Sequence, residues 1–282
     1  MAQKRRPVRR LLSGVCAFVS RGPLGLRAEY QRDATREIAK PHDAAIVTEA
    51  DLAALPAPVQ RYLRVSGAVG QSKVSNFRAR WLGRIRRSAR EPWMAFSAEQ
   101  LNTYGVPESR LFKMDAVQRG LPVDIYHRFI AESATFRVRL ASIFTIVDAK
   151  GPEMDRSETV TLFNDMCILA PGALIDPALR WIAIDAHAAR VIFTRMHQEI
   201  EAELHFNDAG ELIDFISDDR SRASPDGKSF KRERWSTPLS EYRAFGTHRL
   251  SSMGVARTDD PAGAFDYAEL RLQAIDYNVT GS

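Results

Sequence analysis

Hydrophobic and polar side chains alternate without a break over residues 196–206. The hydrophobic set is Ile200, Ala202, Leu204 and Phe206, and the polar set is His197, Glu199, Glu201, Glu203 and His205. A period of two residues predicts a β-strand with one buried face. Turn residues follow at 207–210, and a second extended run covers residues 212–219. The pattern therefore predicts an antiparallel hairpin.

The same period returns from Ser75 onward. Phe77, Ala79, Trp81 and Ile85 share one face of this predicted strand, and Arg78, Arg80, Arg84 and Arg86 share the other. Weaker alternation predicts further strands around residues 96–100, 112–116, 123–129, 136–140, 181–184, 191–196, 230–235, 248–253 and 270–279. Strand follows strand at hairpin intervals, which favours an antiparallel sheet over parallel crossover units.

Two segments have helical periodicity instead. Thr48, followed by Asp51, is typical of a helix start, and two prolines divide the helical pattern that ends near residue 66 into two short pieces. A second helix is expected to be capped by Asp155 and Glu158 and to end at Pro171 and Gly172. Its apolar stripe is Leu162, Phe163, Met166, Cys167 and Ala170.

These elements predict a mainly β (α+β) fold of roughly ten strands and two or three helices. The simplest arrangement of these elements is one large curved antiparallel sheet, or an open half-barrel, that wraps one or two helices. We expect a single β-rich domain over residues 41–282 with an N-terminal helical segment. Residues 1–40 are expected to be a basic tail that is disordered or lies on a membrane surface.

The distribution of charge along the chain is more informative than the net charge. The chain has 282 residues, 45% of them hydrophobic, and a formal net charge of +5. Residues 1–28 hold seven bases and no acid, which leaves residues 29–282 at −2. A folded domain that binds nucleic acid usually carries its own surplus of Lys and Arg. We therefore expect no nucleic-acid partner, and an anionic membrane surface as the partner of the tail.

The tail also contains an apolar stretch at residues 11–19, which is about half of what a membrane-spanning helix needs. The residues after it are a poor signal-cleavage site. We expect a protein that is cytoplasmic or peripheral at the inner membrane, and the alternative is export through a degenerate N-terminal signal. Cys16 and Cys167 are too few for a disulfide framework or a cysteine-rich metal site.

The polar face at residues 197–205 combines imidazoles and carboxylates, which are suitable metal ligands. Side chains two residues apart on a strand stand about 7 Å apart, however, so they converge poorly on one ion. We interpret this face as solvated or ion-paired, with Arg78, Arg80, Arg84 and Arg86 as suitable partners; these arginines could also contact a phosphate. No metal, cofactor or catalytic residue is assigned, because no catalytic or nucleotide-binding motif is present.

Several buried positions allow two interpretations. His127 shares an apolar face with Val123, Ile125 and Phe129, which is more typical of a hydrogen-bonded core histidine than of a base. Cys167 is expected to be a small apolar filler. Bulky aromatic residues on many strands either line an apolar cavity or fill the core. These candidate ligand-binding residues are Phe77, Trp81, Trp93, Phe96, Tyr104, Phe112, Phe136 and Trp235.

Short runs across the chain carry a family resemblance. They are Leu55-Pro56, Pro58-Val59, Tyr62-Leu63, Ser66-Gly67, Pro92-Trp93-Met94 with Phe96, Gly120 to Val123, Asp148 with Gly151-Pro152-Glu153, Trp181 with Ile184-Asp185, and Tyr242 with Phe245-Gly246. Over about residues 48–279 the chain resembles an uncharacterised bacterial family catalogued as a domain of unknown function (6544-type). The resemblance implies a fold similar to the open β half-barrels of bacterial lipoprotein carriers, which can enclose an acyl chain.

The predicted fold and the family resemblance allow three functional hypotheses. The first is non-enzymatic binding of an apolar or amphipathic, lipid-like ligand in the half-barrel. The second is hydrolysis of a lipid-like or small ester substrate by residues that only the fold brings together. The third is a structural or interaction module with a filled core and no ligand.

Overall fold

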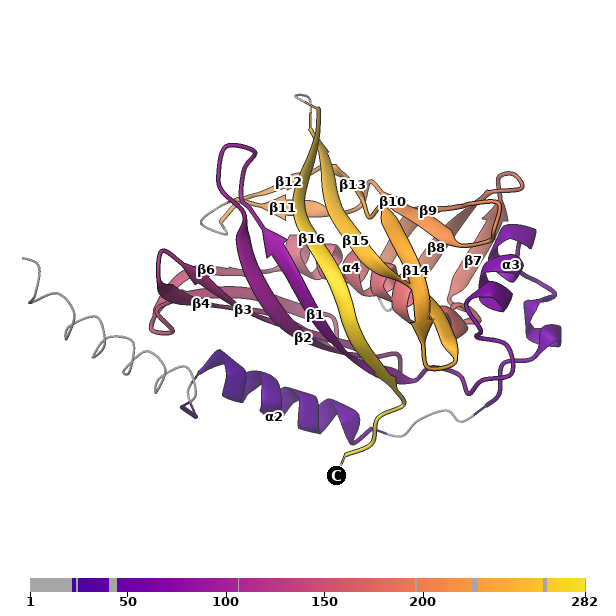
Figure 1. Ribbon diagram of the computed structural model, residues 1–282, viewed down its shortest axis with the longest axis horizontal. Helices are drawn as coiled ribbons and strands as arrows, with labels where there is room; N and C mark the ends of the chain where they lie inside the picture. Colours follow the sequence, from indigo (N-terminus) through magenta and orange to yellow (C-terminus); the bar gives the residue numbers. More distant parts are fainter. Residues whose placement is uncertain are drawn as a thin grey trace, which may run out of the picture.

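The structure is a computed structural model and describes residues 22–23, 25–40, 45–105, 107–195, 197–224, 228–260 and 263–281. One curved fourteen-stranded sheet contains about half of these residues and surrounds a central helix (Figure 1). The helices are α2 (Leu26–Ile38), α3 (Ala57–Val65) and α4 (Pro152–Leu169), with 3₁₀ turns at Glu49–Leu52 and Pro171–Leu174. The strands are β1 (Asn76–Ile85), β2 (Met94–Thr103), β3 (Ser109–Gln118), β4 (Leu121–Ile130), β5 (Ser133–Leu140), β6 (Phe144–Lys150), β7 (Leu179–Ala183), β8 (Ala188–Arg195), β9 (Gln198–Phe206), β10 (Leu212–Ser217), β11 (Ser221–Ala223), β12 (Phe230–Arg232), β13 (Arg234–Ser236), β14 (Leu239–Phe245), β15 (His248–Asp260) and β16 (Gly263–Tyr277).

The sheet is antiparallel and open. Its strand order is β6-β5-β4-β3-β2-β1-β16-β15-β13-β10-β9-β8-β7, while β14 pairs with β15 beside this path and β11 pairs with β12 separately. The C-terminal strand β16 lies in the middle, where it joins β1 to β15. Strands β6 and β7 are the two edges and do not pair with each other. The predicted open half-barrel with a helix inside is therefore confirmed.

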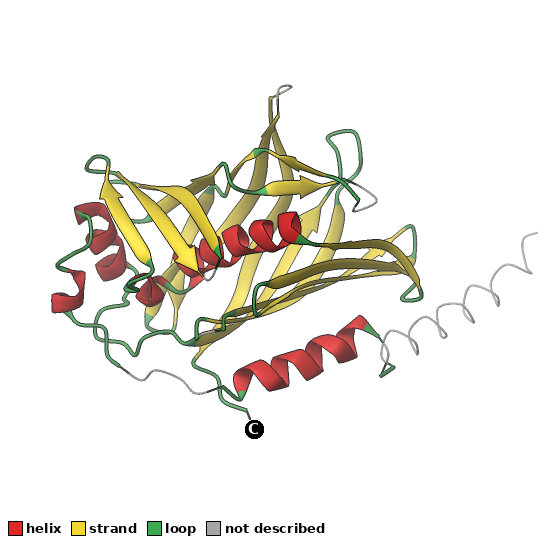
Figure 2. Ribbon diagram, turned by 180° about the vertical axis from the view of Figure 1, so that it is seen from behind, coloured by secondary structure: helices red, strands yellow, loops and turns green. Residues whose placement is uncertain are grey.

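Helix α4 connects the two edges of the sheet. It follows β6 at one edge and precedes β7 at the other, so it passes across the concave face (Figure 2). An eighteen-residue helix is about 27 Å long, which suits this crossing. Phe163 packs its ring against Phe193 at a centroid distance of 4.9 Å and against Phe215 at 5.7 Å. Apolar contacts therefore fix α4 to the half of the sheet formed by β8–β10.

Helix α2 covers the opposite, convex face of β2–β4. Its apolar residues recur every four positions and pack on residues of the convex face of these strands; the set is Leu26, Tyr30, Ala34, Ile38, Leu101, Leu111 and Tyr126. Tyr126 also donates a hydrogen bond of 2.9 Å to Asp33. The prediction of a tail over residues 1–40 is thus wrong for residues 26–38, whose four-residue spacing builds a packed helix. Residues 1–21 of that tail lie outside the described residues.

No helix within the described part of the chain is long and apolar enough to cross a membrane.

Local sequence signals placed several elements correctly. Thr48 and Asp51 form the expected capping box, and two short helical pieces follow each other before residue 67. The prediction for α4 was wrong at its start: Gly151 precedes the helix and Pro152 occupies its first turn. Asp155 instead accepts a hydrogen bond from the amide of Ala134. The described residues form sixteen strands, more than the roughly ten expected, because short strands escape a search for alternation.

The predicted polar face of β9 is solvated and ion-paired, as expected. Glu199 and Glu201 are exposed, and Arg190 of β8 lies 3.3 Å from Glu201 and 3.6 Å from Glu203. The arginines of β1 are not its partners, because β1 pairs with β2 and β16. Arg84, for example, pairs with Glu269 of β16.

Replacing Phe163 by Ala should lower the free energy of unfolding by about 3–5 kcal/mol, because it leaves a cavity between α4 and the sheet. Chemical denaturation measures this loss. Phe144→Ala is the matched control, since the Phe144 side chain is 64% exposed. A change of less than about 1 kcal/mol for Phe163→Ala would mean that these contacts do not hold α4 in place.

Candidate functional site

The concave face of the sheet and α4 border a cavity of about 730 Å³. Its apolar lining comes from the inner faces of the strands, and its polar lining comes mainly from α4 and from the chain around β11 and β12. The main apolar residues are Trp81, Ile85, Met94, Phe96, Phe112, Met114, Val123, Ile125, Phe136, Val138, Ile146, Val147, Trp235, Leu239, Phe265, Tyr267 and Leu270. Both kinds of surface therefore meet in one cavity.

The strand register orders the sheet wall into rows. One row runs across β2–β5 and consists of Gln100, Phe112, His127 and Phe136. The next row, two residues along each strand, is entirely apolar and consists of Trp81, Ala98, Met114, Ile125, Val138 and Val147. Side chains two residues apart share a face, so the wall becomes less polar from the Gln100 row to the Met114 row. The wall thus has a polar end at the Gln100 row and an apolar middle, and beyond the end of β1 the side chains of Arg86, Arg87 and Glu91 border the cavity.

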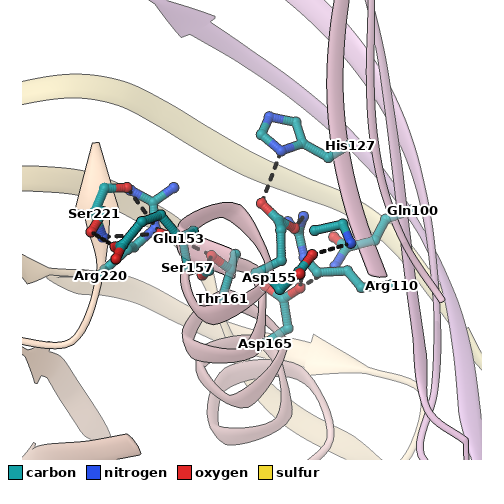
Figure 3. A network of polar contacts seen from close by, with 12 residues as sticks. Gln100, Arg110, His127, Glu153, Asp155, Ser157, Thr161, Asp165, Arg220 and Ser221 are labelled. Carbon is teal, nitrogen blue, oxygen red and sulfur yellow. Dashed lines mark hydrogen bonds and ion pairs between the residues drawn. The ribbon is translucent and has the colours of Figure 1, made fainter. Parts of the chain in front are cut away.

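A network of charged side chains builds the polar end (Figure 3). Arg110 of β3 donates to Asp165 at 2.6 Å and to Glu158 at 3.0 Å, both on α4. Gln100 of β2 donates to the same oxygen of Asp165 at 2.7 Å. All three ionic groups are almost fully buried, so they are paired with one another rather than solvated by water. The network joins the β2–β4 half of the sheet to α4.

His127 extends the network into the cavity. Its Nδ1 lies 3.0 Å from Glu158, and its ring lies 4.1 Å from that of Phe136. Burial lowers the pKa of His127. Burial of Glu158 opposes ionisation, but the charge of Arg110 and the hydrogen bond from His127 outweigh it and lower the pKa of Glu158 to about 2. A neutral imidazole therefore donates from Nδ1 to a carboxylate, and its Nε2 remains an acceptor.

Asp165 differs from Glu158 in its electrostatics. Burial raises the pKa of Asp165, and the charge of Arg110 counteracts this only in part. Its partner Gln100 is oriented by Trp81, whose indole N–H donates to the Gln100 side-chain oxygen at 2.9 Å. A hydrogen-bonded chain thus runs from the apolar row into the ionic network.

A third group at the polar end comes from the segment between β10 and β12. Arg220 donates from Nε to the Thr161 hydroxyl of α4 at 3.2 Å, and its guanidinium lies 4.7 Å from the ring centre of Trp235. The amide of Ser221 donates to the Ser157 hydroxyl at 3.0 Å. These contacts dock the β11–β12 hairpin on α4 beside the cavity.

Five of the eight predicted ligand-binding aromatics line the cavity, namely Trp81, Phe96, Phe112, Phe136 and Trp235. Phe77, Tyr104 and Trp93 are not among its lining residues. Phe77 is fully buried and packs against Tyr104 at 6.1 Å. The Trp93 ring instead lies near the guanidinium groups of Arg84 and Arg86. These three side chains belong to the surrounding packing.

Sequence reasoning did not assign the polar residues of the cavity to a site. His127 was placed on an inward strand face, and by two-residue spacing Gln100 shares a face with Phe96 and Arg110 shares a face with Phe112. A polar or charged residue on a predicted inward face was the sequence signal that could have identified these three residues as part of a site. Glu158 and Asp165 gave none, because acidic residues on a helix usually face solvent. The interpretations of His127 as a hydrogen-bonded histidine and of Cys167 as a buried filler are confirmed.

A model described as a family of unknown function (DUF6544) matches residues 45–270 of the chain. The chain belongs to this family. The match includes the short runs that carried the sequence resemblance up to Gly246.

Solved structures similar to this DUF6544 chain share little sequence with it. A DUF1329 family protein from Desulfovibrio piger is 9% identical, with a TM-score of 0.43 over 83% of this chain and 95% of the other. A LolA superfamily protein from Nitrosomonas europaea is also 9% identical, with a TM-score of 0.43 over 83% and 94%. No curated protein matches the chain.

In this DUF6544 protein, Glu158→Gln should lower the free energy of unfolding at pH 7 by about 3 kcal/mol, because the pKa of Glu158 falls from 4.5 to about 2 on folding. A lowered pKa stabilises the folded state above the unfolded value. The difference from wild type should therefore shrink as the pH falls below about 4.5. Denaturation at several pH values measures it.

Glu153→Gln is the matched control, because Glu153 lies on the same helix and is exposed. Gln keeps the oxygen that accepts from Ser221. An equal loss in both variants, or a loss for Glu158→Gln that does not change with pH, would contradict the assigned electrostatics.

Proposed function

We propose that this protein binds an amphipathic, lipid-like molecule in the cavity. The observation that carries the proposal is the polarity gradient along a cavity of about 730 Å³, a volume within the roughly 300–1,000 Å³ typical of ligand sites. The apolar part of the ligand lies against the row that contains Met114, Ile125 and Val138. Its polar group lies near α4, where Arg110, His127 and Arg220 border the cavity.

Two features favour this proposal over the alternatives. A filled interaction module would lack the cavity. A hydrolase of the nucleophilic type needs an activated Ser or Cys beside a base. Burial raises the pKa of the Cys167 thiol, and Cys167 does not line the cavity. The hydroxyl of Ser157 lies 2.7 Å from the carbonyl oxygen of Glu153 and bonds to the backbone of Ser221, not to His127.

We also propose that the end of the sheet near the start of α2 faces an anionic membrane surface. Arg27, in the first turn of α2, pairs with Asp115 of β3, so the basic segment before α2 joins the body close to the β3–β4 turn. Val123 pairs with both Ala116 and Leu140, which places the β3–β4 and β5–β6 turns at the same end. Exposed apolar side chains gather there, namely Val117, Leu121, Ile143 and Phe144. Apolar and basic groups together favour an anionic bilayer surface. This proposal applies equally to a cytoplasmic and to an exported protein.

Ala256→Phe should weaken ligand binding by at least about tenfold, because Ala256 lines the cavity on β15 and a ring there occupies the ligand's space. Fluorescence titration with the apolar probe N-phenyl-1-naphthylamine measures binding. Ala95→Phe adds the same ring at an exposed position of β2 and should bind as wild type does. Equal affinities in the two variants would place the probe outside the cavity.

Native mass spectrometry of freshly purified protein, followed by organic extraction, identifies any molecule already bound. A stoichiometric acyl compound supports the proposal. Absence of probe binding, together with an unchanged mass after incubation with membrane extract, overturns it.

The double variant Val117→Ser/Phe144→Ser should co-sediment less with vesicles that contain anionic phospholipid, because it removes the two most exposed apolar side chains of the turn region. Ile182→Ser is the control, since Ile182 is exposed on β7 at the opposite edge of the sheet. Equal co-sedimentation of wild type and the double variant would contradict the proposed membrane-facing end.

A further inference from the structure

The cavity concentrates positive charge. Six cationic side chains line it, namely Arg86, Arg87, Arg110, Arg220, Arg222 and Lys231, against three carboxylates, namely Glu91, Glu158 and Asp165. Residues 29–282 as a whole carry a formal charge of −2. The surplus of cations is therefore a property of the cavity and not of the folded chain.

Most of these cations already have acidic partners. Arg110 pairs with Glu158 and Asp165 on α4. Arg87 pairs with Glu91. Arg222 and Lys231 both pair with Glu233, which lies outside the cavity lining. The charges of Arg110 and Arg87 are compensated before any ligand binds, and Arg222 and Lys231 share the single carboxylate of Glu233.

Arg220 has no carboxylate within ion-pair distance among the described residues, although it is half-buried beside the ionic network. Its Nε donates to Thr161, and its guanidinium lies over the Trp235 ring. These contacts fix the plane of the group, and no acceptor among the described residues is hydrogen-bonded to its two terminal nitrogens. An arginine held in this way is preorganised for an anion, because its planar fork matches a carboxylate or phosphate.

Arg86 is the second cation without a carboxylate partner in the described part of the chain, but its surroundings are different. Its Nε donates to the backbone carbonyl of Asp266, and its guanidinium lies near the rings of Trp93 and Phe265. It follows the end of β1, whereas Arg220 contacts α4 at the polar end of the cavity. Arg220 is therefore the better candidate for a ligand group placed beside the network.

We propose that the ligand is an anionic amphiphile and that Arg220 binds its carboxylate or phosphate. This inference rests on the proposed function. The Arg110 network takes no part in direct charge recognition, since its carboxylates already occupy Arg110. The ion pair forms next to apolar walls, where it is stronger than in bulk water. The apolar chain extends from Arg220 along the sheet wall.

The test compares three ligands with the same alkyl chain: palmitate, monohexadecyl phosphate and hexadecanol. Titrations at about pH 8 keep the two acids ionised. Wild-type protein should bind at least one anionic ligand about tenfold or more tightly than hexadecanol, the difference expected for one charge-assisted pair. The anion that binds more tightly distinguishes a carboxylate source from a phosphate source.

Arg220→Gln should remove this preference while leaving hexadecanol binding unchanged, and unchanged hexadecanol binding also shows that the variant is folded. Arg220→Lys should keep part of the preference, because it keeps the charge but loses the fork. Arg271→Gln is the control, since Arg271 pairs with Glu241 and is exposed.

Two results separate the failure of this inference from the failure of the proposed function. If hexadecanol binds wild type as tightly as both anions, or if Arg220→Gln keeps the wild-type preference, the role of Arg220 is overturned and binding in the cavity stands. If none of the three ligands binds wild type, the proposed function is overturned and this inference with it.

Discussion

The passage of α4 from one edge of the sheet to the other is the constraint on which the rest of the structure depends. The chain leaves β6, crosses the concave face and re-enters the sheet at β7. One side of the helix must therefore pack on one half of the sheet, as Phe163 does on Phe193 and Phe215. The other side faces β2–β4 across a space that its side chains do not fill. The cavity is the consequence of a straight helix inside a strongly curved sheet.

The polar character of the cavity follows from the same crossing. A helix buried on nearly all sides usually carries apolar residues throughout, yet α4 buries Glu158 and Asp165. Arg110 pairs with both carboxylates from the opposite wall, so the ion pairs tie the two halves of the sheet together. Removing one partner would leave an uncompensated buried charge, which is costly. The network therefore serves to position α4 and, at the same time, makes one end of the cavity polar.

Local periodicity predicted the sheet, the two short helical pieces and the apolar stripe of α4, because each depends on residues close in sequence. It also selected five aromatics that line the cavity, since alternation shows which side chains share a face. Alternation did not distinguish these five from Phe77 or Tyr104. Whether an aromatic side chain reaches the cavity or packs in the surrounding core depends on the neighbouring strands. The pairing of Arg110 with α4 joins residues 48 and 55 positions apart, and no local pattern predicts such a contact. The strand order, with β16 between β1 and β15, was unpredictable for the same reason.

Because the edges at β6 and β7 are not paired with each other, the curvature of this sheet is less constrained than that of a closed barrel. In a closed barrel, strand number and stagger set the radius. Here no ladder of hydrogen bonds joins β6 to β7, so the curvature of the sheet can change without breaking a strand pair. The width of the interior is then adjustable, while the Arg110 network anchors one end. For the proposed amphipathic ligand, an open sheet of this kind would accommodate hydrocarbon tails of differing girth and unsaturation, and discrimination among molecules would depend on the group at their other end.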